Sequence, residues 1–405
     1  MRGSKLMKLR KFAPWLAILF SVSLLALHFF IGGGRTRIIT DSYNYLSVSD
    51  GVPPGTPFNT RIAGPYIAWF IASISGISNQ AAFQVLTFFA VLASLFLLRV
   101  LIRDLGGSAE WQGATLLSIG CALAATFGYI PVMADPLLLL FTCVVLLALQ
   151  RGHFEIAIVS AILAGLTKEY GLLLSPVVAI VSYRRGHRKA AYAAALLPAI
   201  SFFAITFLPA GTSGHGFQSW RSFVSAMFGY QLSMFQYRGA IQYPQYLYMW
   251  AWSAFWPGLV IAFAVIFSRL RRGVRMQDHE VAFLIMSLAV PILLLGDWGR
   301  SMLIVVPFAC IVATSHRLAS RNSFALLLAV GGLSTALARP FHSDRPLPLA
   351  FTLTMTAVSV VSSSLIGLKM LKWAPDGSTE VLRHGVDNPA SEAVAPGLSQ
   401  PQESV

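Results

Sequence analysis

Acidic and basic side chains stand at the ends of apolar stretches in this sequence, where they could act on a substrate at a membrane surface. The first, Asp41, begins the segment Asp41-Ser42-Tyr43 and lies ten residues after the apolar stretch 12–31. A carboxylate at that position could remove a proton from an acceptor hydroxyl, a role that contributes roughly 10²–10⁴ in rate. The alternative interpretation is that Asp41 caps a short surface helix.

Two further candidates lie next to prolines or apolar segments. Arg61 precedes the apolar segment 62–78, and its guanidinium suits pairing with a lipid phosphate or with Asp41, the alternative being an interfacial anchor. Asp135 precedes Pro136 at the start of another apolar stretch, a combination that predicts the first turn of a helix. Asp135 is therefore either the N-cap of this helix or a carboxylate that projects into an outer cavity.

Two short turns carry charges between apolar stretches. Lys168 and Glu169 interrupt the stretch 156–181. Each charge costs roughly 2.5–3.5 kcal/mol at the centre of a membrane span, so we expect a turn at the outer surface, where Lys168 could bind a phosphate and Glu169 could orient it or a sugar. Asp297 and Arg300 flank a second such turn, and they either bind substrate or only pair with each other.

The elements that must position these residues are apolar helices. Hydrophobic residues make up 56% of the 405 residues and charged residues only 11%, against about 25% charged residues in a soluble domain. The apolar stretches run to about 20 residues without alternation. The fold class is therefore all-α, a polytopic transmembrane bundle of about 11–13 helices with outer loops and amphipathic surface helices. Soluble enzymes, secreted enzymes and disordered scaffolds are excluded.

The Lys and Arg residues indicate topology. The net charge of +14 does not indicate a nucleic-acid partner, because the basic residues cluster between apolar stretches. If 62–78 spans the membrane, the clusters around Arg184 and Arg271 fall outside; if it lies along the outer surface, 21 of the 30 Lys and Arg are cytoplasmic. The positive-inside rule favours the second arrangement, which puts both termini in the cytoplasm. From the composition we expect a bacterial inner membrane; in a eukaryotic cell the same topology would put the active face in the lumen of the endoplasmic reticulum. The predicted spans are 12–31, 80–98, 113–131, 134–149, 154–168, 170–183, 190–209, 250–268, 281–296, 301–315, 323–338 and 347–368.

The transmembrane domain is predicted to cover residues 1–373, with outer loops at 32–79 and 210–249, and residues 374–405 read as a disordered cytoplasmic tail. The three cysteines lie inside apolar stretches, so neither a disulfide framework nor a metal-ligand spacing is present.

The joint pattern resembles the GT-C superfamily of integral-membrane glycosyltransferases, which includes protein O-mannosyltransferases and oligosaccharyltransferases. The resemblance covers residues 10–310 and lies in four short motifs: Asp41 in the first outer loop, Asn59-x-Arg61-x-x-x-Pro65, Asp135-Pro136 and Lys168-Glu169. No second acid stands directly beside Asp41, so a metal site is not supported. No cofactor is predicted, and a divalent cation has no support in the sequence.

The resemblance implies sugar transfer from a polyprenyl-phosphate donor to a lipid, glycan or protein acceptor on the outer face of the membrane. Asp41 would be the general base on the acceptor hydroxyl. The basic residues Arg61, Lys168 and Arg300 would bind the leaving phosphate through charge-assisted hydrogen bonds. The remaining candidates would hold the sugar or keep the basic residues in place: Tyr43, Asp135, Glu169 and Asp297.

Other functions fit parts of the pattern. A secondary transporter places its charges near the bilayer midplane and often has paired repeats, whereas the charges here gather at outer ends and no repeat is visible. A polymerase or ligase of lipid-linked glycans would use Arg221, Arg238 and His215 in the loop 210–249. A non-enzymatic membrane scaffold is the third alternative.

Overall fold

The computed structural model describes residues 2–31, 40–52, 61–128, 130–207, 253–293 and 302–315, together with 361 and 365. Within these ranges the chain forms 12 α-helices, two short 3-10 helices and no strand, which confirms the all-α class. The predicted spans 323–338 and 347–368, the loop 210–249 and the tail 374–405 lie outside the described residues, apart from 361 and 365. The helices are α1 (Arg2–Ile31), α2 (Thr40–Ser49), α3 (Ala63–Ser75), α4 (Asn79–Asp104), α5 (Ala109–Phe127), α6 (Asp135–Arg151), α7 (Phe154–Thr167), η2 (Glu169–Leu173), α8 (Leu174–Arg184), α9 (Arg188–Phe207), α11 (Ser253–Arg271), α12 (Asp278–Leu293), η4 (Met302–Ile304) and α14 (Val306–Thr314).

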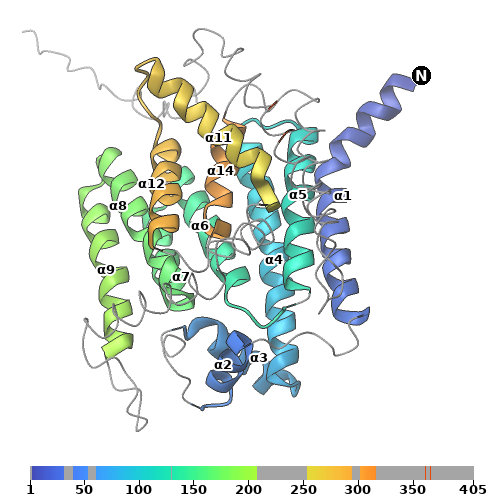
Figure 1. Ribbon diagram of the computed structural model, residues 1–405, viewed down its shortest axis with the longest axis vertical. Coiled ribbons are helices and arrows are strands. Elements are labelled where there is room, and N and C mark those ends of the chain that lie inside the picture. Colours follow the sequence, from blue (N-terminus) through green and yellow to red (C-terminus); the bar gives the residue numbers. More distant parts are fainter. Residues whose placement is uncertain are drawn as a thin grey trace, which may run out of the picture.

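Most helices run up and down a single bundle, and the two ends of this bundle differ (Figure 1). The short helices α2 and α3 lie together at one end, where α4 begins; we call this the site end. The N-terminus of α1 lies at the opposite end, which we call the basic end. Arg61 and Lys168 are the Lys and Arg that the described residues place at the site end. The others lie in the first part of α1, in or just after the last turns of α4, α6, α8 and α11, and at the start of α9, and these helix ends are toward the basic end (Figure 1).

Helix α3 is the part of the segment 62–78 that could either cross the membrane or lie along its surface. It has 13 residues, which span about 20 Å at 1.5 Å per residue, less than the roughly 30 Å of a hydrocarbon core. A left-handed Gly76, at φ 72°, ends it. The helix is therefore too short to cross a bilayer, and the chain enters α4 from the end of the bundle at which it left α1.

Glycines bring α1 and α5 into close contact. A Cβ at Gly120 would lie 2.1 Å from Ser21 Oγ, and a Cβ at Gly128 would lie 2.5 Å from His28 Cβ. Gly113 meets α1 in the same way, with Ala13 Cβ 3.0 Å from its Cβ position. Small residues at such spacing let two helix backbones approach closely. Helix α1 thus packs against α5 from Ala13 to His28.

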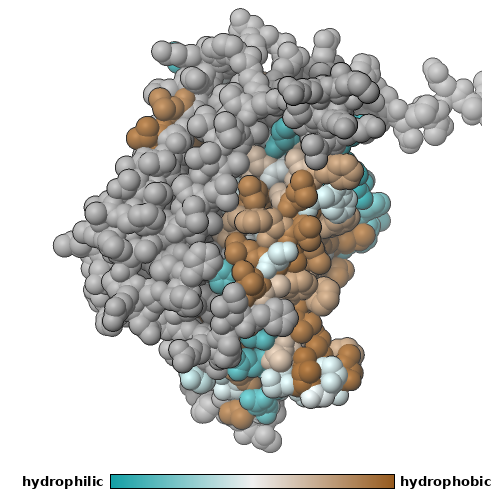
Figure 2. Space-filling view, turned by 90° about the vertical axis from the view of Figure 1, so that its right-hand side faces the viewer, coloured by the Kyte–Doolittle hydropathy of each residue, from teal (hydrophilic) through white to brown (hydrophobic). Residues whose placement is uncertain are grey.

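The outward faces of the helices are apolar, and polar side chains lie inside. On α7, the exposed residues Ile156, Val159 and Leu163 follow helical spacing, whereas Ser160 is buried. In Figure 2 the middle of the face around α1 and α4 is largely hydrophobic where described residues are visible, and hydrophilic residues lie toward its ends. Within the described ranges, two helical segments, Lys11–Phe29 and Asn79–Asp104, are long and apolar enough to cross a membrane. Large exposed apolar surfaces mark contact with a membrane or with another protein, and together with these two helices they indicate membrane association.

Candidate active site

The turn between α7 and α8 points two adjacent charges in different directions. Helix α7 ends at Thr167, and Lys168 adopts an extended backbone with φ −160° and ψ 140° before η2 begins at Glu169. The turn folds back closely on α7, because a Cβ at Gly171 would lie 2.1 Å from the carbonyl carbon of Ala164. The predicted turn at Lys168-Glu169 is confirmed, and Gly171 is the residue that permits it.

Lys168 pairs with Asp135. Its Nζ donates a 2.8 Å hydrogen bond to Asp135 Oδ1, and both side chains are only 1% exposed. The Lys168 ammonium also lies 4.7 Å from the centre of the Tyr170 ring, within the range of a cation–π contact. Asp135 is the first residue of α6, and the N-cap position belongs to Ala134. The prediction of a helix start is confirmed, but the interpretation of Asp135 as the N-cap is wrong.

Arg61 pairs with Glu169. Its Nε donates to Glu169 Oε2 at 2.8 Å and its Nη2 donates to Glu169 Oε1, so the guanidinium binds the carboxylate through a bidentate pair of hydrogen bonds. Its Nη1 donates to the hydroxyl of Tyr45 at 3.1 Å. Arg61 is 5% exposed. It is therefore a buried, bidentate partner of the second charged turn residue, and the interpretation as an exposed interfacial anchor is wrong.

Helix α2 lies over these ion pairs with one face. Ser42 Oγ donates to the carbonyl of Val132 at 3.0 Å, and Ser49 Oγ donates to the carbonyl of Pro65 at 3.1 Å. Tyr45 lies on the same face and is fully buried, whereas Tyr43 is 61% exposed. Tyr43, predicted to bind substrate, thus lies on the outward side of α2.

The Tyr45 hydroxyl lies within electrostatic reach of Asp41, Asp135 and Arg61. Burial raises the pKa of this phenol well above its usual value, the charges of Asp135 and Asp41 act in the same direction, and Arg61 opposes them. Asp41, in the first turn of α2, is half-buried, whereas Asp135 and Glu169 are buried. Asp41 is therefore the more open carboxylate at the edge of a buried ionic cluster.

We call this group the ionic cluster; it consists of Asp41, Tyr45, Arg61, Asp135, Lys168 and Glu169. It contains five of the eight predicted site residues. Asp297 and Arg300 lie outside the described residues. Tyr45 was missed by the sequence analysis, although its spacing of four residues from Asp41 places the two on one face of a helix.

The cluster brings together two buried cations, each paired with a buried carboxylate, and the more open carboxylate of Asp41. Lys168 and Arg61 carry the two kinds of donor that recognise phosphate in proteins: the ammonium is a point charge and the guanidinium is a planar fork.

No protein-family model, curated protein or solved structure matches this chain. Within the described ranges, no three His, Cys, Asp or Glu side chains gather closely enough to hold a metal ion. The functional argument therefore depends on the geometry of the ionic cluster.

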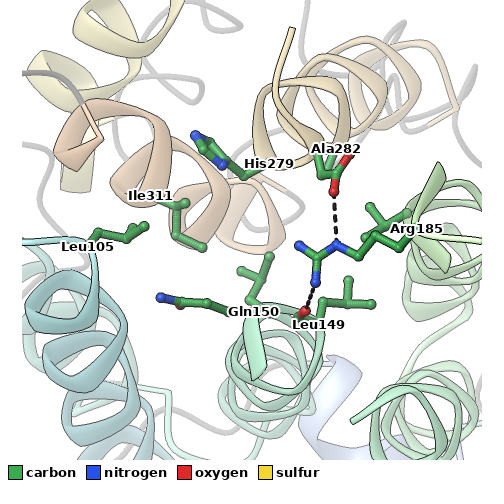
Figure 3. A pocket seen from close by; sticks show the side chains of 10 residues that line it. Leu105, Leu149, Gln150, Arg185, His279, Ala282 and Ile311 are labelled. Atoms are coloured by element: carbon green, nitrogen blue, oxygen red, sulfur yellow. Dashed lines mark hydrogen bonds and ion pairs between the residues drawn. The ribbon is translucent and has the colours of Figure 1, made fainter. Parts of the chain in front are cut away.

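A cavity of about 60 Å³ lies at the other end of the bundle, among α6, α8, α12 and α14 (Figure 3). His279 and Gln150 stand on opposite sides of it, and within the described residues His279 Nε2 and Gln150 Oε1 have no hydrogen-bond partner. Asp278, in its wall, pairs with Arg185 at 2.9 Å. The volume suits a few water molecules and is far below the roughly 300–1,000 Å³ of ligand sites. The ionic cluster is therefore the candidate active site.

Proposed function

We propose that this protein is a polytopic, GT-C-like membrane glycosyltransferase that moves a sugar from a polyprenyl-phosphate donor to an acceptor hydroxyl at the site end. The observation that carries the proposal is the juxtaposition of a half-buried carboxylate, Asp41, with the buried pairs Arg61–Glu169 and Lys168–Asp135 at one end of an apolar bundle. A lipid-linked phosphate donor needs both a cationic phosphate site and a base at membrane depth.

The proposed reaction assigns one task to each part of the cluster. Asp41 takes the proton of the acceptor hydroxyl while the oxygen of that hydroxyl forms a bond to the anomeric carbon of the sugar. The bond from that carbon to the phosphate oxygen breaks, and the electron pair leaves with the polyprenyl phosphate. The charges of Lys168 and Arg61 stabilise the phosphate as it departs.

The acids of the two ion pairs have a positioning role. Asp135 and Glu169 hold the ammonium and the guanidinium in one geometry through the bonds described above. A buried cation without an anionic partner lowers the stability of the folded protein by several kcal/mol, because the desolvation of its charge is not compensated. Asp135 and Glu169 therefore preorganise the phosphate site, while Asp41 is the better placed base because its side chain is more open.

The proposed orientation puts the site end outside the cytoplasm, in a bacterial inner membrane with a cytoplasmic N-terminus. Its support is the separation of charge, because the described Lys and Arg other than Arg61 and Lys168 lie toward the basic end. The positive-inside rule assigns such an end to the cytoplasm. The place of α3 supports the same arrangement, since it lies with α2 at the site end and α4 then starts at the end where α1 finishes.

The depth of Lys168 favours an enzyme over a transporter. Helix α7 starts at the basic end and has 14 residues, a rise of about 21 Å at 1.5 Å per residue. Lys168 thus lies beyond the middle of a hydrocarbon core of roughly 30 Å, toward the site end. Transporter sites lie near the midplane. The polymerase or ligase alternative depends on the loop 210–249, which lies outside the described residues.

The decisive experiment compares sugar transfer in membranes by the wild type, Asp41→Asn and Asp50→Asn. Asp50 is a matched control in the same loop, since its carboxylate accepts a hydrogen bond from Asn79 at the surface. With radiolabelled polyprenyl-phosphate sugars, we expect transfer by the wild type and Asp50→Asn, and a loss of roughly 10²-fold or more in Asp41→Asn. Equal transfer by all three would remove Asp41 as the base, and no transfer from any donor would overturn the proposed class.

A further inference from the structure

A cation–aromatic cluster stands on the outer surface of α1 and α4, toward the basic end. Arg99 of α4 places its Cζ 4.1 Å from the centre of the Trp15 ring. Trp15 also contacts Phe96, one turn before Arg99, with ring centroids 6.2 Å apart. Lys11 precedes Trp15 by four residues on α1, so both lie on one face of that helix. Lys11, Trp15 and Arg99 form a group that we call the α1–α4 patch.

The two cations of the patch lack acidic partners. No carboxylate of the described residues forms an ion pair with Lys11 or Arg99, and Arg99 Nε is buried without a hydrogen-bond partner. The acid at the end of α4, Asp104, already pairs with Arg103 at 2.8 Å and Arg151 at 3.0 Å. The neighbouring surface is apolar, since Phe96 and Leu16 are exposed. Within the described residues no acid compensates these two cations, and the anionic headgroup of a lipid is a partner of the right charge at this level of a membrane.

The position of Arg99 along α4 matches the depth of lipid headgroups. Arg99 lies five residues before the end of α4 at Asp104, about 7.5 Å along the helix axis. A long basic side chain extends toward the interface and keeps its charged group among polar groups. Trp is the residue that favours this level of the membrane. The guanidinium thus lies where lipid phosphates are found.

We propose that the α1–α4 patch binds the phosphate of an anionic phospholipid of the cytoplasmic leaflet. The guanidinium donates paired hydrogen bonds to the phosphate, Lys11 adds a point charge, and Trp15 holds the guanidinium plane from one face. The proposal depends on the membrane orientation above but not on sugar transfer.

The test measures binding of short-chain phosphatidylglycerol and phosphatidylcholine to the full-length protein in detergent, by native mass spectrometry. The variants are Arg99→Gln and Arg188→Gln; Arg188 is an exposed basic residue at the start of α9 and loses the same charge. We expect phosphatidylglycerol to bind the wild type more tightly than phosphatidylcholine, and Arg99→Gln alone to weaken it about tenfold, the effect of one charged hydrogen bond. Lys11→Gln, on an exposed side chain, replaces Arg99→Gln if that variant does not fold.

Equal binding of the two lipids by the wild type would overturn the proposal. Equal weakening by Arg99→Gln and Arg188→Gln would also overturn it, because it would indicate diffuse attraction to the whole basic end. Sugar transfer plays no part in the readout, so failure here is separate from failure of the proposed glycosyltransferase. Retained binding in Asp41→Asn would show the independence of the two sites directly.

Discussion

Lys168 Nζ donates a 2.8 Å hydrogen bond to Asp135 Oδ1 between a turn that follows α7 and the first residue of α6. The two helices run in opposite directions and pack together, which brings the start of one beside the end of the other. Both side chains are 1% exposed, so the charge of each is compensated mainly by the other. This pair, with Arg61 and Glu169, places two buried cations and two buried carboxylates together beneath α2.

Removing one member of the buried Arg61–Glu169 pair should strongly destabilise the protein. Glu169→Gln leaves a buried guanidinium without its anion, which costs about 3–5 kcal/mol. Asp278→Asn is the control, because its partners Arg184 and Arg185 have side chains 27% and 35% exposed, and such pairs contribute roughly 0–1 kcal/mol. Denaturant unfolding in detergent measures both variants. Similar losses in the two would show that the cluster is not insulated from water.

Replacing both partners should separate stability from function. In Arg61→Met with Glu169→Met, neither partner is left as an unpaired buried charge, and such replacements are often neutral or stabilising. We expect stability near that of the wild type together with loss of sugar transfer, measured by unfolding and by the transfer assay. A stable double variant with full transfer would remove Arg61 from the phosphate site.

Gly171→Ala should disturb the charged turn. The added methyl group would meet the backbone of Ala164 and Gly165 at 2.1–2.6 Å, and overpacking of this kind costs about 1–3 kcal/mol. Gly64→Ala is the control, since its Cβ would meet Phe83 at an ordinary 3.7 Å. We expect a lower melting temperature and less transfer only in Gly171→Ala. The opposite order would contradict the close packing of η2 on α7.

Tyr45→Phe should change how stability depends on alkaline pH. Burial raises the pKa of Tyr45 above its usual value of about 10, so the unfolded chain releases this proton first as the pH rises. The contribution of Tyr45 to stability is thus present below pH 10 and lost above it, at up to about 1.4 kcal/mol per pH unit. Unfolding at pH 9 to 11 should show a shallower decline in Tyr45→Phe, and parallel declines would contradict its burial.

Cysteine labelling should distinguish the two ends of the bundle. The native Cys121, Cys143 and Cys310 are buried, so single cysteines at exposed sites can be labelled against a low background. A membrane-impermeant maleimide should label Ser75→Cys, at the site end, in intact cells and Arg188→Cys, at the basic end, only after lysis. Labelling in the reverse order would invert the proposed orientation.

The local features of this protein were predictable from its sequence. A long run of apolar residues predicts a helix from the local sequence alone, because the preference of each side chain for lipid or a protein interior over water does not depend on its distant neighbours. Breaks such as Asp135-Pro136 and Lys168-Glu169 were predictable for the same reason, since a proline or a pair of charges acts on its own segment. Five residues of the cluster were therefore found as candidates one at a time.

Their pairing was decided only by the tertiary structure. Arg61 and Glu169 are 108 residues apart, and Lys168 and Asp135 are 33 apart. Which cation meets which anion depends on how α6, α7 and the segment before α3 pack, and no local pattern encodes it. The same holds for α2, a ten-residue helix whose inward face was settled by the hydrogen bonds of Ser42 and Ser49 to other segments. Those contacts bury Tyr45 and expose Tyr43, because a short helix acquires its orientation from the surface on which it packs.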